Sequence, residues 1–339
     1  MKKVTVIMST YNTPNEYLEK ATNSILNQTY KNIEFIIVVD GDKDNLLFLK
    51  KFKDDRIKII YNEKNIGLPA SLNKAIKIST GEYIARMDSD DISLPNRIEM
   101  QLNYLEKYKY IDILGTYALT FGDRLHISMY PYYDSESIKA QLMFRCALIH
   151  PTIMIRKSFL IKNKLDYNEQ FYTAQDYELW CRALVYGNIT IAPFIGLKLR
   201  IHKKQASQEK RQLQIKNSGK IISKNISNIL KDKYLINYES IEHVFMILGQ
   251  KEKLTKDNYV DVVNIINFIN RSNIEVVNKK KLQKEMKILM FISIMRSKLI
   301  SFKVIKHIFS LTIFEYIIKK IFITTKCYIQ YKIWEKKYE

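Results

Sequence analysis

The chain has 339 residues, 47% of them hydrophobic, and a formal net charge of +20. A chain of this length and apolar content can bury one large core or two smaller ones, which excludes a disordered or fibrous protein. The three cysteines, Cys146, Cys181 and Cys327, stand far apart, in no disulfide or metal-ligand spacing. Because the N-terminal residues also lack the apolar core of a secretory signal, we expect a reducing, cytoplasmic location.

The positive charge is concentrated in the second part of the chain. Residues 1–200 carry 27 Lys and Arg against 23 Asp and Glu, whereas residues 201–339 carry 28 against 12. The second part therefore holds +16 of the net charge of +20. This asymmetry predicts two parts with different physical tasks.

The first 200 residues alternate between predicted strands and helices. Val4–Met8 is an apolar run that ends in a polar turn, and Pro14 opens a segment with helical periodicity. The pattern continues with a strand at 33–39, an acidic loop at 40–44, a strand at 56–61, a helix at 68–79 and a strand at 83–87. Strands that are apolar on both faces and separated by helices indicate an α/β fold with a mainly parallel, Rossmann-like sheet flanked by helices.

This alternation of predicted strands and helices ends near Ser207. The rest of the chain has no convincing strand, hardly any Gly or Pro, and long stretches of Ile, Leu, Lys and Asn. Helices are the expected structure there. The sequence thus predicts an α/β domain over residues 1–205 and a basic, mainly helical region over residues 206–339.

A cluster of carboxylates follows the predicted strand at 83–87. In an open parallel sheet, ligands bind beyond the carboxyl ends of the strands. At strand periodicity Asp88 and Asp90 point to the same side, so their carboxylates repel unless a cation lies between them. Mg²⁺ and Mn²⁺ accept such oxygen ligands together with substrate phosphates. The alternative is a helix start with Asp90 or Asp91 near the first turn.

Two further loops could contact a nucleotide. Asp40-Gly41 follows the second predicted strand, although an ordinary Asp-Gly turn is the better explanation when this loop is taken alone. The loop from Asn65 to Leu68 leads into a helix whose free amides could face a phosphate. Each of these signals is weak when it is taken alone.

Taken together, these motifs resemble those of a known family. They are Ser9–Asn12, Asp40, Asn65–Asn73, Asp88–Asp91 and Gln175–Trp180. Their order and spacing are similar to those of family 2 glycosyltransferases with the GT-A fold, particularly bacterial enzymes of surface-polysaccharide synthesis. The resemblance covers residues 1 to about 205. It implies transfer of a hexosyl group from a UDP-sugar, a divalent cation and inversion at the anomeric carbon.

The resemblance also implies roles for residues that match the family motifs. Thr10 and Tyr11 would border the uracil, and Asp40 would read the base. Asn65 would lie at the diphosphate, and Asp88 would lie near the ribose. These five residues are the expected nucleotide contacts.

Asp90 would hold the metal, Mn²⁺ or Mg²⁺, that bridges the diphosphate. In similar enzymes a histidine that follows the helix carrying the catalytic base completes the shell of ligands around the metal or the diphosphate. In this chain that histidine would be His202. The alternative is a solvated surface histidine. One departure concerns the loop after Val39. It reads Asp-Gly-Asp where many members have two adjacent acids and then Gly-Ser, which leaves nucleotide contacts of Asp42 open.

The resemblance assigns the general base to Asp176. A base must stand away from the metal because the acceptor oxygen and the leaving phosphate lie on opposite faces of the sugar carbon. Asp176 falls at a predicted helix start, where the helix dipole favours its ionised form. The alternative is a purely structural cap, since Thr173 and Asp176 fit a variant of the capping box. Gln175 stands where the family has an acid, and is at most a contact to the acceptor.

Residues 286–334 interleave lysines with aliphatic and aromatic residues. No stretch reaches the roughly 18 apolar residues that a spanning helix needs. Basic helices of this kind suit the headgroup layer of an anionic membrane. The expectation is peripheral attachment to the inner face of the cell membrane, with a glycan or undecaprenyl-type lipid-linked acceptor and no nucleic acid. The alternative is a helical bundle with a solvated basic face.

Two rival functions remain open at this stage. A sugar-nucleotide nucleotidyltransferase would have a Gly-rich, Arg-containing loop after the first strand, where this chain has Thr-Tyr-Asn. A non-catalytic protein that binds nucleotide sugars or membranes could keep the same motifs. A dinucleotide dehydrogenase is disfavoured because no Gly-x-Gly-x-x-Gly follows the first strand.

Overall fold

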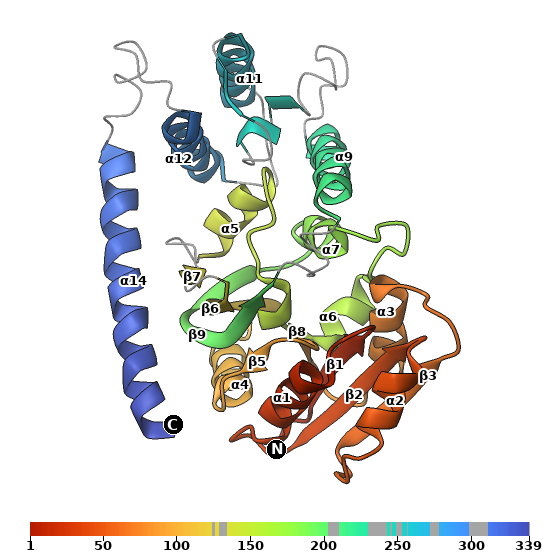
Figure 1. Ribbon diagram of the computed structural model, residues 1–339. Coiled ribbons are helices and arrows are strands. Elements are labelled where there is room, and N and C mark those ends of the chain that lie inside the picture. Colours follow the sequence, from red (N-terminus) through yellow and green to blue (C-terminus); the bar gives the residue numbers. More distant parts are fainter. Residues whose placement is uncertain are drawn as a thin grey trace. The chain divides into compact units, whose positions relative to one another are not determined.

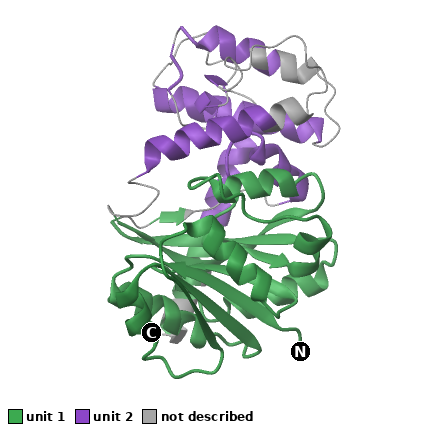
Figure 2. Cartoon of the chain, turned by 90° about the vertical axis from the view of Figure 1, so that its right-hand side faces the viewer, with its two compact units in different colours: residues 1–129, 148–209, 327–339 green, residues 130–147, 210–326 purple. Residues whose placement is uncertain are grey.

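The chain forms two compact units, which Figure 2 shows in different colours. The first unit comprises residues 1–129, 148–209 and 327–339, and the second comprises residues 130–147 and 210–326. The computed structural model describes residues 1–123, 126–128, 134–202, 210–229, 243–244, 246–248, 253–255, 257–271, 278–297 and 311–338. The predicted boundary at 205/206 lies outside these residues. The inclusion of 130–147 in the second unit and of 327–339 in the first was not foreseen.

The first unit is built on a mixed sheet (Figure 1). Its strands are β1 (Val4–Thr10), β2 (Ile33–Asp40), β3 (Ile57–Asn62), β4 (Tyr83–Asp88), β5 (Ile92–Ser93), β6 (Ile113–Gly122), β7 (His126–Ser128), β8 (Met154–Arg156) and β9 (Ile189–Ile201). They lie in the order β3-β2-β1-β4-β8-β6-β9-β5, with β7 beside β6. Strands β1 to β4 are mutually parallel, as are β6 and β9, whereas β8 pairs antiparallel with both β4 and β6.

Helices connect these strands. Those of the first unit are α1 (Asn15–Leu26), α2 (Lys43–Leu49), α3 (Leu68–Ile78), α4 (Arg97–Lys107), the 3₁₀ turn η1 (His150–Thr152), α6 (Lys157–Lys162) and α7 (Gln175–Ala183). All eight residues of β2 are buried, as expected for a parallel strand covered on both faces. The core joins apolar residues of β1, β2 and β4 to those of α1 and α4.

The predicted strands and helices over residues 1–88 are confirmed, with their ends moved by one or two residues. The acidic loop at 40–44 is shorter than predicted because α2 begins at Lys43. Asp42 is the N-cap of this helix, and its carboxylate accepts hydrogen bonds from the backbone N–H groups of Asp44 and Asn45. This local role accounts for Asp42 without a nucleotide.

The described part of the second unit is helical, as predicted. Its helices are α5 (Ser135–Leu142), α9 (Arg211–Ile229), α11 (Tyr259–Arg271), α12 (Lys279–Ser297) and the first part of α14 (Leu311–Tyr338). Arg145 forms an ion pair with the buried Glu285 of α12 at 3.0 Å, which ties the 130–147 segment to α12. Within the described residues, no helix combines the length and apolar character required to cross a membrane.

Candidate active site

The carboxyl ends of β1, β2 and β4 meet at one edge of the sheet. Ser9 of β1 pairs in register with Val38 of β2 on one side and with Asp88 of β4 on the other. The turn after β1, Asp40 at the end of β2 and the acidic loop after β4 therefore lie next to each other. This is the edge at which ligands bind in α/β sheets.

Three carboxylates gather after β4. Asp88, Asp90 and Asp91 each offer one oxygen, and these atoms lie within 4.8 Å of one another. Burial raises the pKa of Asp91 well above its usual range, and the charges of Asp88 and Asp90 raise it further. One oxygen of Asp91, Oδ2, is buried without a hydrogen-bond partner. Crowded oxygen donors of this kind suit a hard divalent cation, so the residues present fit Mg²⁺ or Mn²⁺.

The alternative of a helix start at these acids is wrong. After Asp91 the chain forms the short strand β5, and α4 begins only at Arg97, with Asn96 as its N-cap. Asp90 and Asp91 therefore lie in a loop between two strands and not in the first turn of a helix.

Asp88 is paired with a buried arginine, Arg86. The buried Arg86 guanidinium forms an ion pair with the carboxylate of Asp88. Burial raises the pKa of Asp88, the charge of Arg86 opposes this rise, and the carboxylates of Asp90 and Asp176 add to it. The influence of Asp176 means that a carboxylate 88 positions further along the chain lies within electrostatic range of the acidic loop.

Arg200, near the end of β9, forms hydrogen bonds with the acidic loop. The backbone N–H of Arg200 donates to Asp91 Oδ1 at 2.8 Å, and its side-chain Nε donates to the backbone oxygen of Asp90 at 2.8 Å. The Arg200 guanidinium stacks on the rings of Tyr17 and Phe121 at 3.8 and 4.4 Å. Sequence reasoning missed Arg200, because its hydrogen-bond partners Asp90 and Asp91 are more than 100 residues away.

His202 lies beside Asp90, as its predicted role as a metal ligand requires. Its Nε2 is 3.0 Å from Asp90 Oδ2, and both side chains are partly exposed. Its ring also lies 5.9 Å from that of Tyr17, measured between centroids. His202 is thus a neighbour of the acidic loop and not an isolated surface residue.

The turn after β1 is fixed by Asn45 of α2. The buried Thr10 hydroxyl donates to Asn45 Oδ1 at 2.7 Å, and Asn45 Nδ2 donates to the backbone oxygen of Thr13 at 2.8 Å. The hydroxyls of Thr13 and Ser89 lie 2.7 Å apart and join this turn to the acidic loop. Tyr11, at the tip of the turn, is exposed. Of the two predicted uracil neighbours, only Tyr11 presents its side chain to solvent.

Asp40 holds the loop between β3 and α3. One of its oxygens accepts from the backbone N–H of Ile66 and from Asn62 Nδ2, each at 2.9 Å, and the other accepts from the N–H of Gly67 at 2.9 Å. Asp40 is buried, whereas Asn65 in the same loop is exposed. The carboxylate of Asp40 therefore shapes the loop between β3 and α3, which is more than an Asp-Gly turn requires.

Gly67 must be glycine for two reasons. Its φ of +90° lies in the left-handed region, and a Cβ atom there would be 2.8 Å from Cε1 of Tyr172. Tyr172 is exposed and belongs to the loop that leads into α7. This contact places the loop before the predicted base against the loop that Asp40 holds.

Asp176 lies in the first turn of α7. The N-cap of this helix is Ala174, which adopts left-handed backbone angles with φ of +61° and offers no capping side chain. The helix therefore begins one residue later than the alternative of a capping box from Thr173 assumes. Asp176 is partly exposed, whereas Gln175 is buried.

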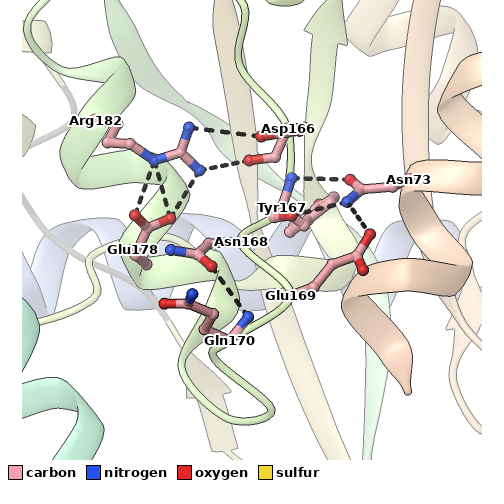
Figure 3. A network of polar contacts seen from close by, with 8 residues as sticks. All are labelled: Asn73, Asp166, Tyr167, Asn168, Glu169, Gln170, Glu178 and Arg182. Atoms are coloured by element: carbon pink, nitrogen blue, oxygen red, sulfur yellow. Dashed lines mark hydrogen bonds and ion pairs between the residues drawn. The ribbon is translucent and has the colours of Figure 1, made fainter. Parts of the chain in front are cut away.

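A polar network fixes the loop before α7 (Figure 3). The side chain of Asn73 on α3 pairs with the backbone of Tyr167: its Oδ1 accepts from the N–H at 2.9 Å, and its Nδ2 donates to the carbonyl at 2.8 Å. Arg182 of α7 donates to the backbone oxygen of Asp166 and forms an ion pair with Glu178 at 2.7 Å. The loop is thereby tied both to α3 and to α7.

The comparisons with known proteins agree on one family. The family described as "Glycosyl transferase family 2" matches residues 5–174. An uncharacterized glycosyltransferase of Methanocaldococcus jannaschii is 38% identical over 53% of this chain, and the match spans 64% of that relative, just under two thirds. An uncharacterized glycosyltransferase of Haemophilus influenzae is 31% identical over 72% of this chain and 80% of its own length.

Solved structures show the same fold. The crystal structure of residues 1–349 of S. aureus TarS in complex with UDP-GlcNAc has a TM-score of 0.59 and 18% identity, and the similarity covers 87% of this chain and 88% of that TarS fragment. The fold is GT-A, as the motifs predicted, with its mainly parallel sheet flanked by helices and a helical region after it.

Proposed function

Because the chain belongs to glycosyl transferase family 2, we propose that it is an inverting enzyme that transfers a sugar from a UDP-sugar to a hydroxyl group of a glycan or lipid-linked oligosaccharide. The product would be a surface polysaccharide such as capsule, O-antigen or exopolysaccharide. The observation that carries the proposal is the cluster of carboxylates of Asp88, Asp90 and Asp91 at the carboxyl edge of the parallel strands. TarS, a protein of the same fold, binds UDP-GlcNAc, which supports a nucleotide-sugar donor.

The donor would lie along the edge formed by β1, β2 and β4. In this proposal Thr10, Tyr11 and Asp40 surround the base, Asn65 faces the diphosphate and Asp88 faces the ribose. The exposed ring of Tyr11 supports stacking on uracil. Thr10 and Asp40 are buried and hydrogen-bonded within the chain, so their contribution would be to shape the loops that contact the base.

Asp90 and His202 would hold a divalent cation, Mn²⁺ or Mg²⁺. Their proximity and the neighbouring carboxylates support this assignment. When bound, such a cation offsets the negative charge of the diphosphate as it leaves. Arg200, which donates to the backbone of the same loop, would keep both ligands in position.

Asp176 would act as the general base. Its carboxylate would take the proton of the acceptor hydroxyl while the acceptor oxygen forms a bond to the anomeric carbon. The bond from that carbon to the phosphate oxygen breaks in the same step, UDP leaves with the electron pair, and the configuration inverts. The place of Asp176 in the first turn of α7, with its side chain partly exposed, supports this role.

We also propose that the basic region over residues 206–339 associates with the inner face of the cell membrane. Its charge of +16 counted from residue 201 supports attraction to an anionic surface. An acceptor linked to a lipid would then be reached from the membrane surface.

Release of UDP from a panel of UDP-sugars, measured with Mn²⁺ and an acceptor, tests the proposed function. We expect release that depends on the acceptor and stops in EDTA. Absence of release from every donor, with binding intact, would support a non-catalytic protein. Formation of pyrophosphate from a sugar phosphate and UTP would instead indicate a nucleotidyltransferase.

A further inference from the structure

The long helix α14 has an apolar face that no other part of the described chain covers. Phe314, Ile321 and Phe322 are 62%, 62% and 67% exposed. They belong to a set of large exposed apolar side chains that recur every three or four residues along the helix: Phe314, Ile317, Ile318, Ile321, Phe322, Tyr328, Ile329 and Ile333. At 100° per residue these side chains fall within an arc of roughly 160° and extend over roughly 30 Å. We call this set the α14 stripe.

The opposite side of the same helix is already packed. Ile313 and Tyr316 are buried against Ile288 of α12, and Glu315 forms an ion pair with Lys284 at 2.8 Å. Cys327 further along the helix is buried as well. One face of α14 thus packs within the chain. The exposed α14 stripe lies on the other face, so packing within the described chain does not account for its apolar character.

The neighbouring helix α12 has no comparable surface. Its apolar residues Leu282, Met286, Ile288, Leu289 and Ile294 are buried, and Met295 is the one large apolar residue of this helix that is exposed. Both helices are rich in lysine, isoleucine and phenylalanine or methionine, so the sequence alone did not distinguish them. In the structure, the apolar side chains of α12 are largely buried, whereas those of the α14 stripe are exposed.

Positive charge accompanies the stripe. Helix α14 contains six lysines against two glutamates. Lys319 and Lys326 follow one border of the stripe at helical spacing, and both are exposed. A lysine beside an apolar face can extend its ammonium group toward anionic headgroups while its aliphatic part stays with the apolar side chains.

We propose that the α14 stripe is the surface by which this protein lies on an anionic lipid bilayer, with the helix axis in the membrane plane. A soluble monomer rarely exposes apolar surface of this extent. An interfacial helix combines such a face with basic residues and does not span the bilayer. The inference deepens the proposed function, because it names the element and the side chains that would bring the active unit to a lipid-linked acceptor.

A second copy of the helix is a poorer occupant. A seam between two helices uses a narrower strip of apolar residues, and like charges would face each other across a pair of helices with six lysines each. An anionic bilayer accommodates the wide stripe and attracts the lysines. The two occupants also differ in a measurable way, since self-association changes the molar mass in solution.

Flotation of the full-length protein with vesicles tests the inference. We expect it to float with vesicles of phosphatidylcholine and phosphatidylglycerol, and less with phosphatidylcholine alone. The triple variant Phe314→Gln, Ile321→Gln, Phe322→Gln should bind the anionic vesicles at least about tenfold more weakly, because three apolar side chains no longer enter the lipid. The variant Lys319→Glu, Lys326→Glu should lose binding at low salt and differ little from wild type at high salt.

A matched control replaces three exposed apolar residues that lie outside α14. Leu47→Gln, Ile161→Gln, Val185→Gln removes similar side chains from the first unit and should leave flotation unchanged. Equal flotation of the stripe variant and wild type would overturn the inference, as would no flotation of wild type. So would a wild-type dimer that the stripe variant converts to a monomer without loss of flotation. UDP release with a soluble acceptor should be equal in all variants; wild type that floats but releases no UDP contradicts the proposed function alone.

Discussion

At the scale of single residues, the carboxylates of the site do different work because their surroundings differ. Asp90 stands among two other acids and His202, where charge repulsion favours a cation. Asp176 stands in the first turn of α7, within electrostatic range of Asp88. One change at each position should separate the two roles.

Asp90→Ala should abolish transfer and the part of UDP binding that depends on metal. The remaining acids would lack the oxygen nearest to His202, so the cation would be held poorly. Calorimetry with UDP in Mn²⁺ and in EDTA measures this, and thermal unfolding checks the fold. Asp55→Ala, which removes an exposed carboxylate elsewhere, is the control. Near-wild-type activity of Asp90→Ala would rule out the metal role.

Asp176→Asn should lower kcat by about two to four orders of magnitude and leave the affinity for UDP unchanged, as expected for a group that acts in proton transfer. Single-turnover rates and UDP titrations separate the two quantities. Equal losses of UDP affinity, unfolding temperature and turnover would show that Asp176 supports the structure instead.

The sequence was sufficient to find the acids and insufficient to find the residues that position them. Asp88, Asp90 and Asp176 occur in local motifs, so they could be identified by spacing. Asn45, Asn73 and Arg200 act on Thr10, Tyr167 and Asp91, which are 35, 94 and 109 residues away. No local pattern encodes such a pairing, because it depends on which strands and helices become neighbours.

At the scale of elements, hydrogen bonds from Asn73 of α3 hold the loop before α7 in place. This loop leads to the predicted base, Asp176, in the first turn of α7. Asn73→Ala removes the pair of hydrogen bonds to the backbone of Tyr167 and should lower kcat several-fold with little change in UDP affinity, since α7 loses an anchor. Steady-state kinetics and UDP titration check this. Lys77→Ala, on an exposed position of the same helix, should behave as wild type. A change in UDP affinity without a change in kcat would contradict this role.

Glu34 joins four segments of the sheet and makes its stability depend on pH. Burial alone would raise the pKa of Glu34, but hydrogen bonds from Lys58, Thr5 and Thr80 outweigh it and lower the pKa from 4.5 to about 2. A lowered folded-state pKa stabilises the protein above the unfolded value of 4.5, and this stability is lost as the pH falls toward 2. Its size at neutral pH is on the order of 2–3 kcal/mol.

Glu34→Gln should therefore lower the free energy of unfolding at pH 7 by this order and flatten its decline between about pH 4.5 and pH 2. Denaturant titrations at several pH values measure both effects. Glu63→Gln, an exposed carboxylate at a nearby loop, serves as the control. If the free energy of unfolding of Glu34→Gln declined with falling pH as steeply as that of the wild type, the hydrogen bonds of Glu34 would contribute nothing to stability.

The prediction of elements worked where the periodicity was strong. The apolar runs of β1, β2 and β4 and the apolar stripe of α3 were identified because burial on both faces or on one face leaves a regular pattern. Helix α2 was missed because its seven residues are too few for a period to be visible beside the acidic residues that cap it. Strand β5, with two residues, carries no pattern at all.

At the scale of the whole molecule, the division into units follows contacts that sequence composition cannot show. The charge asymmetry predicted two parts with one boundary, but residues 130–147 belong to the second unit. Within it, α5 packs on α12, Lys281 pairs with Asp134 at 3.3 Å and Arg145 pairs with Glu285. Local patterns identify helices, but they do not show which unit a helix joins.

A fragment ending at residue 278 should consequently aggregate more strongly than a fragment ending at residue 310. The shorter fragment lacks α12, so the buried Ile138 and Leu142 of α5 and the charge of Arg145 lose their partners. Light scattering of the two purified fragments checks this. Equal solubility of both would show that α5 does not depend on α12.

The separation of Arg145 from its partner Glu285, 140 positions along the chain, also has a consequence for synthesis on the ribosome. At roughly 5–20 residues per second, α12 is made about 7–28 seconds after α5. During this interval the apolar side of α5 lacks the helix on which it packs in the complete second unit. The nascent protein should therefore expose a binding site for chaperones over residues 134–147 until translation passes residue 297.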